Sequence, residues 1–268
     1  MIAIAHFVAI SLYLGATALA AAPFARPIRA PVRGVIVLLL LGVLAHSTGL
    51  GILAARAGQA PFTGLGPALS FAGLTLAATL LIVEILARDV SLTLVAAPLA
   101  AIPTIAANMI GFVTLAEPGG AKGAWLLAHI ALSFAGIAAF GTAAAAGTMY
   151  LVERRELKSR RFGAVFRFFP PLDTLDRVNH AAAIAGWLSL TLGVALAGTY
   201  AIAYDEIDMP KIAWALGAWL AVSAIALGRV IGGWKAQRAA IVSSVAFAAV
   251  VAFYVAVRIA VAEPGRFL

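Results

Sequence analysis

Eight long apolar segments dominate this chain of 268 residues and constrain its fold more than any other feature. A run of about 18 or more apolar residues is long enough to cross a membrane as a helix. Because lipid offers no hydrogen-bond partner, a spanning segment must pair its own backbone groups, as an α-helix does. Charged residues make up only 11% of the chain, against 63% hydrophobic residues. The sequence therefore predicts an all-α, polytopic membrane protein.

The eight segments are expected to pack as one bundle, a single integral membrane domain that covers residues 1–268. Their approximate predicted bounds are 2–24, 34–54, 67–87, 91–116, 123–152, 177–204, 210–230 and 239–261. The first segment resembles a secretory signal peptide, but Arg26, Arg29 and Arg33 follow it, whereas a signal peptide carries its charge in front. We therefore interpret the first segment as a retained helix.

The basic residues predict how the bundle is oriented. Loops that face the cytoplasm carry an excess of Lys and Arg. With the N-terminus outside, only five of the nineteen basic residues face the periplasm, namely Arg56, Lys122, Lys211, Arg258 and Arg266. This bias predicts that both termini are periplasmic, in a bacterial inner membrane. Basic loops beside membrane lipids also explain the net charge of +8, and no aromatic-basic pattern indicates nucleic acid.

Several kinds of chemistry leave no signature in this chain. It has no cysteine, which excludes disulfides, thiolate metal sites and covalently attached c-type haem. It also has no phosphate-binding loop, no nucleophile elbow and no paired carboxylates within a span. These absences favour a role other than catalysis.

The stretch FFPPLDTLDRVNH, at residues 168–180, interrupts the apolar pattern before the sixth segment. Pro170 and Pro171 cannot continue a helix, so they predict a break at this point. Asp173 or Thr174 is expected to cap the helix that follows, since such side chains accept hydrogen bonds from free backbone N–H groups.

The same stretch resembles a loop of cytochrome c assembly proteins of the CcsA type, most closely their smaller YpjD/HemX-like relatives. Four further stretches carry the resemblance. They are LAHSTGL at 44–50, residues 126–158 with LLAHIALSFAGIAAFG and the basic residues that end this helix, residues 208–240 with DMPKIAWALGAWL and the GGWKAQR loop, and VAFYVAVR at 251–258. The eight helices and the chain length are similar too. The resemblance implies a membrane protein that handles haem.

The chain departs from the CcsA pattern at three places. The predicted outer loop TYAIAYDEIDMPK lacks the tryptophan-rich motif that presents haem in CcsA-type proteins. No histidine follows the last helix, and Gly228 and Arg229 stand where those proteins have a histidine near the end of the seventh helix. Only His129 matches a haem ligand of that family. The resemblance therefore implies haem holding, transfer or sensing rather than delivery to apocytochrome c in the CcsA manner.

Three of the four histidines lie in the predicted outer half of the membrane. His46 and His129 lie at similar depths in the second and fifth segments. Two imidazoles can hold haem iron from both faces inside a helical bundle, so this pair is the predicted iron site for haem b. His6, in the first segment, is a substitute ligand. The alternative is that each imidazole hydrogen-bonds a neighbouring helix.

His180 lies instead at the inner end of the sixth segment. It is expected to bond Asp173 or Asp176 at the interface, or to contact haem from the inner side. Arg258 either snorkels to the membrane surface or pairs with a haem propionate. Trp214 and Trp219 belong either to an aromatic belt or to the wall of a haem pocket.

The sequence thus predicts a haem-binding inner-membrane protein related to cytochrome c biogenesis, with bis-histidine ligation. Its expected partners are membrane lipids, haem and another integral membrane protein or cytochrome c assembly component. Two alternatives stay open: a non-haem partner or scaffold subunit of a larger membrane complex, and a small-molecule transporter.

Overall fold

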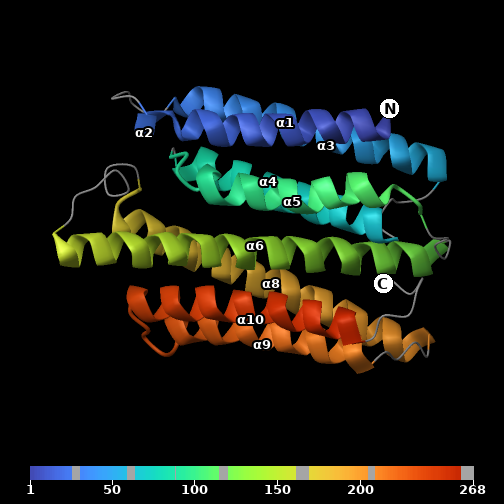
Figure 1. Cartoon of the computed structure of the whole chain (residues 1–268). Helices are drawn as coiled ribbons and strands as arrows, with labels where there is room; N and C mark the ends of the chain where they lie inside the picture. Colours follow the sequence, from blue (N-terminus) through green and yellow to red (C-terminus); the bar gives the residue numbers. More distant parts are fainter. Residues whose placement is uncertain are drawn as a thin grey trace. The chain divides into compact units, whose positions relative to one another are not determined.

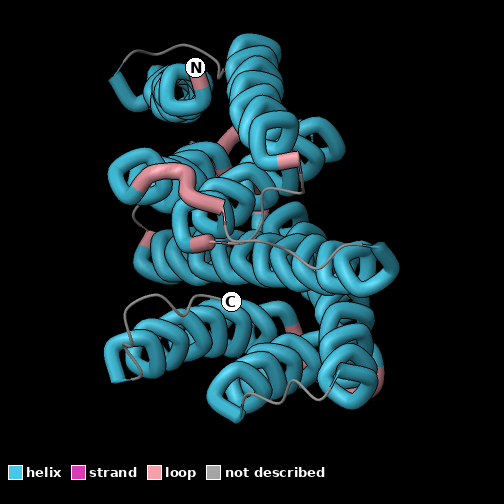
Figure 2. Tube along the Cα trace, turned by 90° about the vertical axis from the view of Figure 1, so that its right-hand side faces the viewer, coloured by secondary structure: helices cyan, strands magenta, loops and turns pink. Residues whose placement is uncertain are grey.

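The computed structural model describes residues 1–25, 31–58, 64–87, 89–114, 120–160, 169–204 and 209–260. Within these ranges every regular element is an α-helix (Figure 2). The helices are α1 (Ile2–Ala20), α2 (Ala22–Ala25), α3 (Val32–Ala57), α4 (Leu65–Ala87), α5 (Thr93–Ile110), α6 (Gly120–Ser159), α8 (Leu172–Tyr204), α9 (Met209–Val230) and α10 (Ala236–Ala260). Among the described residues, eight spans are long and apolar enough to cross a membrane. This confirms the all-α, eight-helix prediction, while the periplasmic location of the termini stays a prediction.

Two helices differ most from their predicted segments. The fourth segment ends at Ile110, because Gly111 adopts a φ of 95° and stops the helix there. The fifth segment continues to Ser159, well beyond its apolar part. Its last residues are rich in Glu, Arg, Leu and Lys, all good helix formers, so the helix persists where the hydrophobic pattern ends.

The proline pair acts as predicted, but the capping prediction is wrong. The helix α8 begins at Leu172, directly after Pro171. Asp173 and Thr174 therefore lie inside its first turn and neither is the residue before the helix. Proline tolerates this position because its missing N–H is not needed at a helix start. Asp173 instead pairs with the exposed Arg177, at 3.3 Å.

The chain divides into two compact units. The first unit contains α1 to α5 and the end of α6 from Arg155, and the second contains α6 as far as Arg154 with α8, α9 and α10. That residues 1–268 act as a single membrane domain stays a prediction.

In the first unit, α1 packs against α3 and α5, and α4 packs against α3 and α5; the pairing of α1 with α3 is visible in Figure 1. Two glycines of α3 allow this close approach. A Cβ at Gly42 would lie 2.6 Å from the ring of Tyr13, and one at Gly49 would lie 2.7 Å from the ring of His6. Small residues at such contacts let membrane helices approach closely. Polar side chains of α1 can therefore reach the interior of the unit.

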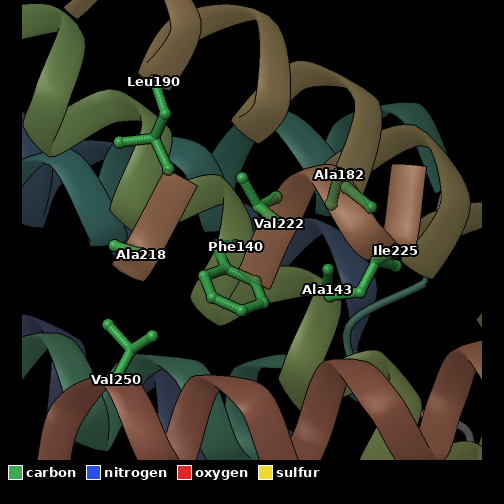
Figure 3. Close-up of a cluster of buried hydrophobic side chains, with 9 residues drawn as sticks. Phe140, Ala143, Ala182, Leu190, Ala218, Val222, Ile225 and Val250 are labelled. Carbon is green, nitrogen blue, oxygen red and sulfur yellow. The ribbon is translucent and has the colours of Figure 1, made fainter. Parts of the chain in front are cut away.

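The core of the second unit is built around Phe140 of α6 (Figure 3). Its buried members are Phe140, Ala143, Ala182, Ala183, Leu190, Ala218, Val222, Ile225 and Val250. The small residues among them let α6, α8, α9 and α10 come close together. Gly186 is one such point, since a Cβ there would lie 3.1 Å from the carbonyl oxygen of Gly136.

Candidate functional site

His6 and His46 meet in the interior of the first unit. Both side chains are fully buried, and their ring centroids lie 4.9 Å apart with the rings inclined at 71°. The Oγ of Ser70, also fully buried, lies 2.7 Å from Nε2 of His6 and 2.9 Å from Nε2 of His46. The hydroxyl of Tyr13 lies 3.2 Å from Nδ1 of His46. We call Tyr13, His46, Ser70 and His6 the histidine network.

The hydrogen bonds of the histidine network run in one direction when both imidazoles are neutral. The Nδ1 of His6 lies 2.8 Å from the carbonyl oxygen of Ile2, which can only accept, so Nδ1 carries the hydrogen. The bare Nε2 of His6 then accepts from the Ser70 hydroxyl. Ser70 has only one hydrogen, so it accepts from Nε2 of His46. The remaining nitrogen of His46, Nδ1, accepts from the Tyr13 hydroxyl.

The spacing of residues along α1 and α3 explains why these side chains meet. His6 and Tyr13 are seven residues apart and lie on one face of α1. Gly42 and Gly49 have the same spacing on α3 and face these two side chains. His46 lies between the glycines, on the same buried face. The rings of Tyr13 and His6 thus occupy the space over Gly42 and Gly49, and the side chain of His46 lies between the two rings.

His129 belongs to the second unit and has different surroundings. Its ring is half-buried, and its Nδ1 donates to the carbonyl oxygen of Gly193 on α8, at 2.8 Å. Gly193 is needed for this approach, because a Cβ there would lie 2.9 Å from Oγ of Ser133. Within the described residues, no hydrogen bond reaches Nε2 of His129. Its lone pair is therefore left for another partner.

His180 does not make either of the carboxylate bonds considered for it. Both oxygens of Asp176 bind the guanidinium of Arg229 on α9, with Nη2 and Oδ2 3.0 Å apart. The Nδ1 of His180 is buried and has no hydrogen-bond partner among the described residues. Arg229 thus forms an ion pair between α8 and α9.

The two predicted tryptophans pack inside the second unit. Trp219 donates from Nε1 to Oγ1 of Thr191 at 2.9 Å, and Nε1 of Trp214 lies 3.4 Å from the carbonyl oxygen of Val250. Both rings pack against the Phe140 core. Arg258 lies on α10, but its side chain falls outside the described part of the chain.

The structure therefore brings together two of the predicted residues, His6 and His46, and places His129 and His180 in the other unit. Tyr13 and Ser70 were missed by the sequence interpretation. Tyr13 carries a weak signal, its spacing of seven residues from His6. Ser70 carries none, because serines are common in helix contacts of membrane proteins.

Comparison with known proteins identifies the family. A family model described as "Cytochrome C assembly protein" matches residues 35–262, which include both His46 and His129. The chain belongs to the cytochrome c assembly protein family. This confirms the resemblance found in the sequence, while its YpjD/HemX-like branch stays a prediction.

Two relatives show how far the similarity of this cytochrome c assembly protein extends. The cytochrome c biogenesis protein CcsA of Synechococcus elongatus is 34% identical over 91 residues, which cover 32% of this chain and 28% of that protein. A 28.8 kDa protein from the nifR3-like 5' region of Azospirillum brasilense is 34% identical over 102 residues, 35% of this chain and 37% of the relative. The chain thus spans about a third of the length of these relatives.

Proposed function

We propose that this cytochrome c assembly protein takes part in cytochrome c biogenesis by holding haem b, or by handing it on. His46 and His129 would hold its iron. Haem, when bound, supplies the iron that two imidazole nitrogens coordinate. The family and the eight membrane spans support a role in haem handling in a membrane.

The surroundings of His129 carry the proposal. An imidazole that binds iron needs a bare nitrogen, and ligating histidines donate their other ring N–H to an acceptor that fixes the ring. In His129 the Nδ1–H is held by the Gly193 carbonyl, and Nε2 keeps its lone pair. Its ring would therefore be able to hold the iron as it stands.

His46 fits the same role only after one of its hydrogen bonds is exchanged. Both of its nitrogens are engaged, one by Tyr13 and the other by Ser70. The same holds for His6, whose nitrogens bind Ile2 and Ser70. The histidine network must therefore open before His46 or His6 is available to iron.

The other predicted residues are proposed to act around this site. Trp214 and Trp219 would line it and Arg258 would pair with a propionate, while His180 would provide a contact from the inner side. We propose a bacterial inner membrane as the location, with both termini periplasmic. Another integral membrane protein or a cytochrome c assembly component would then receive the haem or supply it.

The proposal is tested by the absorption spectrum of the detergent-purified protein, oxidised and reduced, with haem quantified. We expect a Soret band and sharp bands in the reduced protein. Substitution of either ligand, His129→Ala or His46→Ala, is expected to abolish the low-spin spectrum.

The matched control is Trp187→Phe, an aromatic substitution in the same unit as His129 but outside the proposed ligands. It is expected to leave the spectrum unchanged. A colourless protein that also fails to take up added haem would overturn the proposed function.

A further inference from the structure

The turn that joins α9 to α10 (Figure 1) carries a pocket of about 520 Å³. Polar and basic side chains line one part of it, namely Lys235, Gln237 and Arg238, and Ile241 lines another part. Among the described residues, none that lines the pocket is acidic. The pocket lies within the second unit, and the proposed function uses none of these residues.

Backbone hydrogen bonds and a stacked ring hold this turn in one shape. The N–H of Gly232 donates to the carbonyl of Leu227 at 3.1 Å. The N–H of Trp234 donates to the carbonyl of Gly228 at 3.0 Å, and a Cβ at Gly228 would lie 2.6 Å from the Trp234 ring. The guanidinium carbon of Arg238 lies 4.3 Å from the centre of the same ring, within the range of a cation–π contact. This stacking keeps the charge of Arg238 beside the pocket.

No carboxylate of the described residues neutralises the positive charges of Lys235 and Arg238. Arg229, near the end of α9, differs from them, because both oxygens of Asp176 bind its guanidinium. The backbone adds to the positive character of the pocket, since α10 begins at Ala236 and the N-terminus of a helix attracts anions. The pocket therefore suits an anion such as a phosphate group, which both lysine and arginine bind.

An exposed apolar face of α10 continues from the pocket along the membrane span. Ile241 and Val245 lie one helix turn apart, and 42% and 64% of their surfaces are exposed. Both belong to the span Ala236–Phe253. A soluble phosphate ester would contact only the basic part of the pocket, whereas a phospholipid would also lay an acyl chain along this face. The basic pocket and the apolar face together therefore fit one amphiphile.

We propose that the α9–α10 turn binds an anionic phospholipid. Its phosphate lies between Lys235 and Arg238, and one acyl chain follows Ile241 and Val245. The turn is on the side of the membrane that is predicted to be cytoplasmic, where anionic lipids give the surface a negative potential. The inference goes beyond the proposed function and does not depend on haem binding. Such a lipid anchors the ends of α9 and α10 at the membrane surface.

The test compares two lipids that have the same acyl chains, phosphatidylglycerol and the zwitterionic phosphatidylcholine. Full-length protein in detergent is titrated with each lipid, and native mass spectrometry counts the lipids that stay bound. We expect the wild type to bind phosphatidylglycerol more tightly. The double variant Lys235→Gln/Arg238→Gln is expected to weaken this binding about thirtyfold, because the phosphate loses two cationic partners. Equal affinity of the wild type for the two lipids overturns the proposal.

The matched control for charge is Lys158→Gln/Arg177→Gln. It removes two exposed basic residues on the same predicted side of the membrane and leaves the pocket intact. We expect this control to bind phosphatidylglycerol as the wild type does. An equal loss of binding in the control would show attraction by overall charge and would overturn the site.

A second pair of variants tests the pocket without any change of charge. Gly228→Ala displaces the Trp234 ring, and Arg238 with it, so we expect severalfold weaker binding of phosphatidylglycerol. Gly217→Ala is its control, since no atom lies within 4 Å of the added Cβ. Should Gly228→Ala fail to fold, Arg238→Lys takes its place, because lysine keeps the charge but loses the planar stack. Binding as tight as in the control overturns the pocket as the binding site.

Inorganic phosphate separates the two sources of a phosphate group. A large excess is expected to leave phosphatidylglycerol bound, because inorganic phosphate makes no contact with Ile241 and Val245. Displacement of the lipid by inorganic phosphate would overturn a phospholipid as the ligand.

Discussion

His6 and His46 lie edge to face in the first unit, with ring centroids 4.9 Å apart, and the hydrogen-bond network places their ring hydrogens on different nitrogens. The carbonyl of Ile2 fixes the ring hydrogen of His6 on Nδ1, so Nε2 of His6 accepts the hydrogen of Ser70. Because Ser70 has only one hydrogen, its oxygen accepts from His46, whose ring hydrogen therefore lies on Nε2. Two imidazoles of the same kind, in the same buried environment, thus present different nitrogens as acceptors.

This relationship can be checked directly by nitrogen-15 NMR of protein labelled at histidine. We expect one buried imidazole in the Nδ1–H form, assigned to His6, and one in the Nε2–H form, assigned to His46. The variants His6→Ala and His46→Ala assign the signals. Observation of the same tautomer for both rings would contradict the network.

The glycines of α3 provide a test of the close packing beneath these rings. Gly49→Ala would place a Cβ 2.7 Å from the His6 ring, so we expect the free energy of unfolding to fall by about 1–3 kcal/mol. Gly51, on the same helix, has no atom within 4 Å of the position that a Cβ would occupy, and it serves as the control. Gly51→Ala should leave stability unchanged or raise it slightly. Thermal unfolding in detergent measures both, and equal effects would count against the packing described.

Two ion pairs of α8 are expected to differ in strength. Asp176 and Arg229 are largely buried, with side-chain exposures of 26% and 12%, whereas Asp173 and Arg177 are exposed at 78% and 72%. Asp176→Asn should lower the free energy of unfolding by about 1.5–3 kcal/mol, because a charged hydrogen-bonded group loses its partner. Asp173→Asn should change it by less than about 1 kcal/mol.

A double-mutant cycle with Arg229→Gln separates this interaction from other effects of the substitution. If the pair contributes as expected, the loss in Asp176→Asn/Arg229→Gln will be smaller than the sum of the two single losses. Additive losses would show that the two residues act independently.

Gly193 is expected to control the orientation of His129. In Gly193→Ala the added Cβ would lie 2.9 Å from Oγ of Ser133, which separates α8 from α6 and breaks the bond to His129. Loss of such a partner typically weakens metal binding by about 10–100-fold. Haem titration monitored by absorbance measures this. Gly198→Ala is the control on the same helix, since no atom lies within 4 Å of that position. Equal haem affinity in the two variants would exclude an orienting role for Gly193.

The helices could be predicted because their cause is local. Lipid requires each spanning segment to pair its own backbone, so an apolar run such as 34–54 indicates a helix without knowledge of its neighbours. The helix ends that were predicted less accurately also have local causes. Gly111 stops α5 by its positive φ, and the polar end of α6 stays helical because its residues favour helix.

The sequence by itself determined the eight membrane helices and the family. Only the tertiary structure decided which polar groups meet. The network joins residues 6, 13, 46 and 70, which lie on three helices. Spacing within one helix shows which residues share a face, but the separation of the three helices along the chain does not show which of their faces meet. Contact depends on how the helices pack, which is set here by glycines that let one helix approach another closely. The hydroxyl of Ser70 can bridge two imidazoles only because helix packing places both rings beside it.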